Sequence, residues 1–245
     1  NDMVILAKAF LDSLHIQNEL SGIKTTGSLK SDCYVKTNFK KLRSTGSVIV
    51  KNGGVSVRGV GRVLADANIN VLLDDNVLNI KDSSLYVNNS KIAVDGKIDE
   101  KSVADIDIKA DKIPLPILFN AFAPKEIRNA YNFKSGDATF ALSVDGKLKK
   151  AVTTLKAGLD NLNISDRAGN FVVTDKNFGA EFFCDSKTLA GKMNNSGLSV
   201  VLPKTKSSVS APSFEAEIAD NNFVIKENKV YALENSSARE DYLVI

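Results

Sequence analysis

Between Gly46 and Ile98, hydrophobic and polar positions alternate with period two, and the alternation is interrupted at short intervals. Apolar runs such as Val48–Val50, Val55–Val57 and Val77–Ile80 each end at a cluster of Asn, Asp, Gly or Ser residues. Half-buried runs with turn signals at roughly 8–12 residue spacing predict consecutive antiparallel strands. We therefore expect an up-and-down meander in which every strand has one apolar and one polar face.

The same rhythm returns after residue 132, and two sequence matches indicate internal repetition. Ile92–Ile98 recurs as Leu142–Leu148, and Asp75–Asp82 recurs as Asp220–Glu227. The two members of the second match are separated by nearly three times as many residues as those of the first. This ratio indicates an array of units of about 48 residues. Template matching gives roughly 18–20 strands, which exceeds the usual limit of about 10 for an open twisted sheet. The prediction is an all-β fold: an elongated, curled antiparallel sheet, shaped like a taco-like groove and built from repeated short meanders.

Two stretches depart from the alternation and have helical character. Residues 2–14 place apolar side chains at helical spacing, and residues 113–132 are apolar almost all round. Pro114 and Pro116 end the preceding strand, whereas Pro124 suits the first turn of a second short helix. Each helical element has two possible roles. The helix at 2–14 either packs on the sheet or faces lipid or a neighbouring segment. The element at 113–132 either packs on the sheet or contacts a membrane.

These patterns predict four segments in the chain. They are a helix at 1–14, a first β-meander at 15–112, a helical insertion at 113–132, and a second β-meander at 133–245 that continues the first. Asn1 at the start and Tyr242–Ile245 at the end have the character of cut ends, so we expect a fragment of a longer chain. No apolar run reaches the 18 residues that a membrane-spanning helix requires.

Composition narrows the classes of function. A net charge of +3 over 245 residues is too weak to predict nucleic acid binding. The chain has no Trp and only 7% aromatic residues, so stacking on bases or sugars is poorly supported.

Candidate chemistry is sparse, and we expect neither an enzyme nor a metal or cofactor site. The single histidine, His15, has no Asp, Glu or Cys at motif spacing. Asp105 and Asp107 alternate with apolar residues and are expected to face solvent, with no apolar pocket to raise a pKa. Cys33 and Cys184 form no CxxC motif. We expect two small buried apolar side chains, and whether they form a disulfide stays open.

The apolar positions of the alternating strands are the candidate functional residues. If they share one face, they line a lipid-binding groove, although alternation alone leaves open whether that face is an open groove or a packed core. The predicted lining residues are Val55, Val57, Ile69, Val71, Leu78, Ile80, Ile92, Val94, Ile106, Ile108, Phe140, Leu142, Val144, Phe214, Ile218, Phe223 and Ile225.

Short glycine-ended strands recur in Ser135–Ser165, which follows the short Leu-rich stretch DKIPLPILFNAF, and in Asn89–Ile98. On these stretches the chain resembles, from about Gly27 to Leu202, the AsmA/TamB superfamily of Gram-negative envelope proteins. Glycine-ended strands such as the one bounded by Gly136 and Gly146 match the repeated family motif. Ala151 departs from the motif, because a proline is common at that place.

The resemblance implies a non-enzymatic lipid-transfer conduit that carries phospholipid acyl chains along a hydrophobic β-groove between the inner and outer membranes. It implies a periplasmic location, an inner-membrane anchor outside this segment, a possible outer-membrane protein partner and no nucleic acid. The family is similar in shape to eukaryotic bridge-like lipid-transfer proteins. The alternative is a structural or adhesive β-repeat protein of the cell envelope with a packed apolar core.

Overall fold

The computed structural model describes residues 23–37, 42–219, 222–226, 229–233 and 241–244. The predicted helix at 2–14 and His15 lie outside these residues. By their contacts the described residues form two compact units. The first runs to Ile108 and also includes Asp145–Leu148, and the second holds the rest. Each unit is described by itself below.

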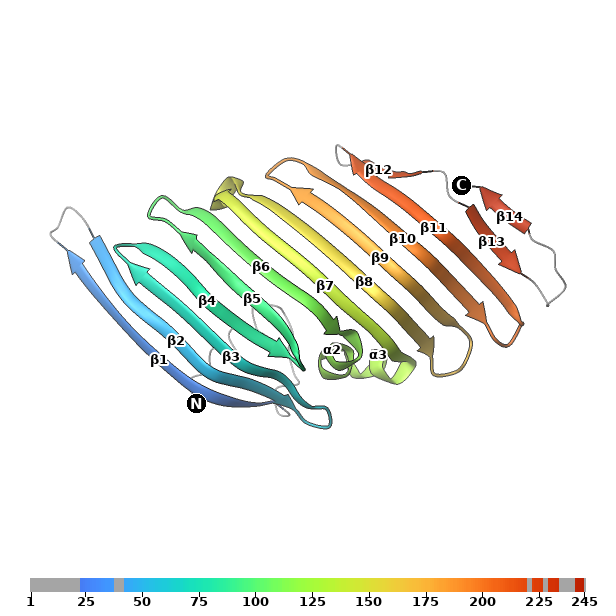
Figure 1. The fold of residues 1–245 in the computed structure, drawn as a ribbon, viewed down its shortest axis with the longest axis horizontal. Coiled ribbons are helices and arrows are strands. Elements are labelled where there is room, and N and C mark those ends of the chain that lie inside the picture. The colour runs from blue at the N-terminus through green and yellow to red at the C-terminus, as the bar shows by residue number, and fades with distance from the viewer. Residues whose placement is uncertain (1–22, 38–41, 220–221, 227–228, 234–240, 245) are drawn as a thin grey trace. The chain divides into compact units, whose positions relative to one another are not determined.

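The predicted fold class is confirmed. The described residues hold 14 strands in one sheet with antiparallel pairing, and the strand order follows the chain from β1 to β11, then β13 and β14, with β12 beside β11 (Figure 1). The order is linear, so the sheet is open. The strands are β1 Ile23–Thr37, β2 Leu42–Val57, β3 Gly61–Asp74, β4 Val77–Val87, β5 Ser90–Ile98, β6 Val103–Pro114, β7 Tyr131–Lys147, β8 Val152–Asp166, β9 Val172–Cys184, β10 Leu189–Leu202, β11 Ser207–Ala219, β12 Asn222–Ile225, β13 Lys229–Leu233 and β14 Asp241–Val244.

Over the described residues, the strands are longer and fewer than the 18–20 predicted for the whole chain, because several expected turns are bulges inside single strands. Asn52 and Asp82 were expected to end strands, yet β2 and β4 continue through them with φ angles of 50°. The ladder register shifts at both places. Asn and Asp enter this left-handed conformation more readily than other residues with a Cβ, so the same residue types mark a turn or a bulge.

Each bulge keeps the apolar side chains on one face of the sheet. Alternation in β2 runs through Val48 and Val50 before Asn52, but through Val55 and Val57 after it. One extra residue would move every following side chain to the opposite face, and the bulge cancels that change. The apolar residues of β2 therefore change from even to odd positions along the sequence and still lie on the same face of the sheet.

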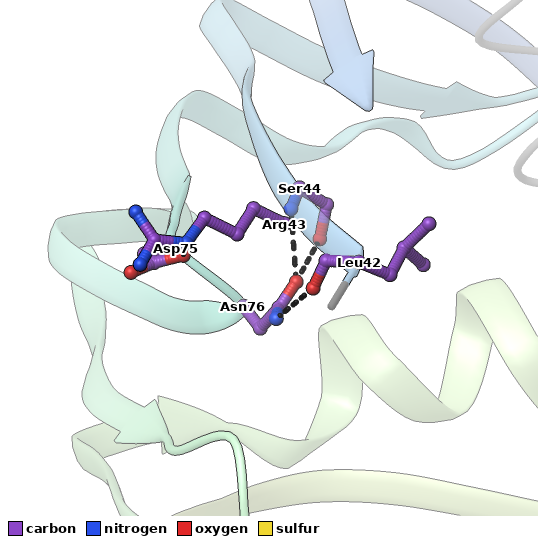
Figure 2. Close-up of polar contacts among 5 residues, drawn as sticks. All are labelled: Leu42, Arg43, Ser44, Asp75 and Asn76. Carbon is purple, nitrogen blue, oxygen red and sulfur yellow. Dashed lines mark hydrogen bonds and ion pairs between the residues drawn. The ribbon is translucent and has the colours of Figure 1, made fainter. Parts of the chain in front are cut away.

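Other Asn, Asp, Gly and Ser clusters form true hairpin turns, and one of these turns is hydrogen-bonded to a strand outside its own hairpin. Asp75 and Asn76 join β3 to β4 with φ angles of 46° and 67°, which is typical of a type I′ turn. Asn76 Oδ1 accepts hydrogen bonds from Ser44 N at 2.9 Å and Ser44 Oγ at 2.6 Å, while Asn76 Nδ2 donates to Leu42 O at 2.8 Å (Figure 2). The turn thereby holds the start of β2.

In the second unit, the predicted helical insertion is confirmed as α2 (Leu115–Phe122) and α3 (Lys125–Ala130). Pro116 lies in the first turn of α2 and does not belong to the strand before it. Proline is tolerated there because N–H groups in the first turn of a helix have no hydrogen-bond acceptor within the helix. The rings of Phe119 on α2 and Phe133 on β7 stack with centroids 4.5 Å apart. This stacking holds α2 against the sheet.

A second set of contacts ties the insertion to the loop after β8. Arg128 Nη1 donates to the carbonyl of Asn120, and Arg167 Nε donates to the carbonyl of Arg128. The backbone N–H of Arg167 donates to the carbonyl of Ala130 at 2.9 Å. Both helices are therefore fastened at their ends through backbone carbonyls.

Candidate functional site on one face of the sheet

In the first unit, the strand register gathers the apolar residues on one face. Directly opposite residues of antiparallel strands share a face, and one such row crosses five strands. Its members are Ser31, Val48, Val71, Ile80 and Gly96. The same registers put eight predicted lining residues on this face: Val55, Val57, Ile69, Val71, Leu78, Ile80, Ile92 and Val94.

On β6 the predicted residues Ile106 and Ile108 alternate with exposed carboxylates. Both isoleucines are half-buried, whereas Asp105 and Asp107 are exposed, as expected from the sequence. A Cβ added to Gly96 would lie 2.6 Å from the Cα and 3.1 Å from the side chain of Ile106. The isoleucine therefore occupies the space beside Gly96 that a side chain there would need.

In the second unit, three rows of directly opposite residues build a corresponding apolar face. They contain the predicted residues Phe214, Ile218, Phe223 and Ile225. The rows are Leu155–Phe182–Gly191–Ile218–Phe223, Ala157–Ala180–Met193–Ala216–Ile225 and Leu159–Phe178–Asn195–Phe214.

The predicted residues Phe140, Leu142 and Val144 belong to β7. A Cβ on Gly158 would lie 2.6 Å from Thr139 Oγ1, and Gly158 is outside the apolar rows because it alternates with Ala157 and Leu159. Thr139 therefore faces the polar side of the sheet. Phe140 and its alternate neighbours face the apolar side.

Within the described residues, α2 packs on β7 of the second unit through Phe119 and Phe133. The main contacts of the strands are with their sheet neighbours. Fifteen of the predicted lining residues are half-buried, and Phe223 and Ile225 are exposed. Among the described side chains, the largest that are fully buried are only Val63 and Val87. The predicted lining residues therefore keep part of their surface exposed.

The opposite face carries a row of alternating charge in the second unit. Lys156, Glu181, Lys192 and Glu217 lie directly opposite one another on β8 to β11. Lys156 Nζ lies 3.0 Å from Glu181 Oε1, and Lys226 Nζ lies 3.3 Å from Glu217 Oε2. Opposite charges in facing positions favour this register.

The expectation of two buried cysteines was wrong. Cys33 and Cys184 are exposed and free, because Cys33 lies on β1, the first strand in the sheet order, and Cys184 is the last residue of β9. The described residues include no group of His, Cys, Asp and Glu side chains placed to hold a metal ion.

Sequence reasoning missed one feature of the apolar face, the buried pair Asp175 and Asn195. The stretch Asp175–Asn177 has the polar composition of a turn, but it lies inside β9. Asn195 occupies a position that the period-two pattern assigns to an apolar residue. This polar residue at a position predicted to be apolar was the signal in the sequence that could have revealed the pair.

The comparisons leave the family open. Neither family models, nor curated proteins, nor solved structures match this chain. Within the described residues, no helix has the length and apolar character needed to cross a membrane.

Proposed function

We propose that this chain is a segment of a lipid-transfer conduit that carries phospholipid acyl chains along the apolar face of its sheet. The observation that carries the proposal is the combination of register and exposure. Apolar side chains from consecutive strands line up on one face, and they stay half-exposed. A contiguous apolar surface left open in this way is typical of an interaction or ligand-binding site.

The ligand follows from the dimensions and chemistry of the face. Strands are spaced about 4.8 Å apart, so a row of apolar side chains across several strands offers a continuous path for an extended hydrocarbon chain. The opposite face of the same strands carries the charged residues Lys156, Glu181 and Lys192, which are readily solvated by water. Such a surface fits a ligand with long apolar tails.

The wider setting belongs to the same proposal. We place the conduit in the periplasm of a Gram-negative envelope, with an inner-membrane anchor outside this segment and a partner at the outer membrane. The protein works without catalysis and without a cofactor. These statements rest on the sequence resemblance and on the apolar face, which is the structural feature that such a role requires.

Native mass spectrometry of the purified chain tests the proposal. We expect phospholipid to remain bound after purification from cells and to be released by delipidation with organic solvent. Protein that never carries phospholipid, even after incubation with phospholipid vesicles, would favour the alternative of a structural β-repeat with a packed apolar core.

A further inference from the structure

A buried polar pair interrupts the apolar face of the second unit. Asp175 on β9 is 6% exposed and Asn195 on β10 is 8% exposed. Asn195 lies directly opposite Phe178 on β9 and Phe214 on β11, so its side chain belongs to the apolar face. Asn195 Nδ2 donates to Asp175 Oδ2 at 3.4 Å, which brings the carboxylate to the same face.

The pair has acceptor capacity that the described residues leave unused. Asp175 Oδ1 accepts a hydrogen bond from the backbone N–H of Asn177 at 3.2 Å. In the described part of the chain, no lysine or arginine forms an ion pair with Asp175. Asn195 Oδ1 is buried and accepts no hydrogen bond.

An arrangement of this kind is costly unless something completes it. A buried carboxylate without a counter-charge and a buried amide oxygen without a donor both lower stability. One group relieves both costs if it carries a positive charge together with several N–H donors. A primary ammonium group has this chemistry, because it presents three donors and no acceptor.

We propose that Asp175 and Asn195 bind the primary ammonium group of an amphiphilic ligand whose acyl chains lie on the neighbouring apolar rows. This inference rests on the proposed function and names the head group that the same face prefers. A trimethylammonium group carries the same charge but has no N–H donor. The pair therefore favours ethanolamine lipids over choline lipids.

Competition between two lipids tests the inference on the full chain. The protein is incubated with vesicles of equimolar dioleoyl phosphatidylethanolamine and dioleoyl phosphatidylcholine and repurified, and its bound lipid is quantified by mass spectrometry. We expect the ethanolamine lipid to be enriched about tenfold, the effect of one charge-assisted hydrogen bond. Asp175→Asn and Asn195→Leu should each reduce the enrichment to near one.

A matched control separates this site from a general effect of charge. Asp160→Asn makes the same change on β8, where Asp160 faces the polar side and accepts a hydrogen bond from Asn177 Nδ2 at 2.6 Å. It should keep the full enrichment. Circular dichroism checks that each variant folds. If neither site variant folds, the ratio of ethanolamine to choline lipid on the wild-type protein still tests the inference.

The outcomes distinguish this inference from the proposed function. Equal amounts of the two lipids on the wild-type protein overturn the ammonium site and leave the conduit standing. Enrichment that persists in both site variants also overturns it. A protein that binds neither lipid overturns the site and the proposed function together.

Discussion

Asn76 shows how one side chain fixes the geometry of a hairpin. Its amide makes three hydrogen bonds to Leu42 and Ser44, and its backbone has a φ of 67°. Arg43 Nε also lies 3.3 Å from Asp75 Oδ1 (Figure 2). The turn therefore contributes to stability through its side chains and not only through its backbone conformation.

We expect Asn76→Gly to lower the free energy of unfolding by about 1–3 kcal/mol, because it removes these three bonds and keeps a residue suited to positive φ. Asn88→Gly is the control. Asn88 also has positive φ, 56°, in the turn between β4 and β5, so its replacement should change the free energy by less than about 0.5 kcal/mol. Urea denaturation measures both, and equal losses would contradict the role given to the Asn76 amide.

Asp166 predicts a pH dependence that is local to the loop between β8 and β9. The backbone N–H of Phe171, which donates to Oδ1 at 2.9 Å, is the main cause that lowers the pKa of Asp166 below 3.8. The N–H of Asn170 and the charge of Lys204 act in the same direction. A lowered pKa in the folded state means that the stabilisation is present above pH 3.8 and is lost as the pH falls through the lower value.

Titration of the Asn170 and Phe171 amide resonances by nuclear magnetic resonance measures this transition. We expect a midpoint below 3.8 in the wild type and no transition in Asp166→Asn. A midpoint at or above 3.8 would show that the loop does not hold the carboxylate in its charged form.

The charge row on the polar face favours the observed register of β9, β10 and β11. Lys192 lies between Glu181 and Glu217. We expect Lys192→Glu to cost about 1 kcal/mol or more, because it puts like charges directly opposite each other on both sides. Lys192→Gln should cost less, and the difference between the two variants should shrink in high salt. Thermal melting at two salt concentrations checks this, and a difference that ignores salt would argue against an electrostatic role.

The helical insertion is expected to open more readily than the sheet beside it. Residues 113–132 include α2 and α3, which interrupt the strand ladder and have no buried residues. Few ladder hydrogen bonds hold this segment, and the side chain of Arg167 supplies one attachment, from Nε to the carbonyl of Arg128. Hydrogen exchange should be faster there than in Ala138–Val144, and faster still in Arg167→Ala. Exchange that is equal or slower in the insertion would count against this expectation.

The sequence predicts the all-β meander, the helical insertion and the apolar face well, because these depend on period-two patterning and on proline. It does not predict strand lengths, because Asn52 and Asp82 carry the same signal as the turn residue Asn76. Only the ladder shows that the first two are bulges. The Asp175–Asn195 pair is likewise hidden, because its two members are 20 residues apart.

The central claim is that the apolar face binds lipid and does not serve as a dry core. Phe140 tests it most directly, since it lies on β7 and is half-buried on the apolar side. Phe183, which lies opposite Thr154 and Ala190 on the polar side, permits the same substitution as a control. In a packed core, Phe140→Glu would bury an unpaired charge at a cost of several kcal/mol. On an open face the carboxylate reaches water.

The deciding measurement is the amount of phospholipid recovered per protein, together with the melting temperature, for the wild type, Phe140→Glu and Phe183→Glu. We predict that the wild type carries phospholipid, that Phe140→Glu folds with a lowered melting temperature and loses most of the lipid, and that Phe183→Glu retains it. A Phe140→Glu variant that does not fold, together with a wild type that never carries phospholipid, would contradict the account and establish a packed β-array in its place.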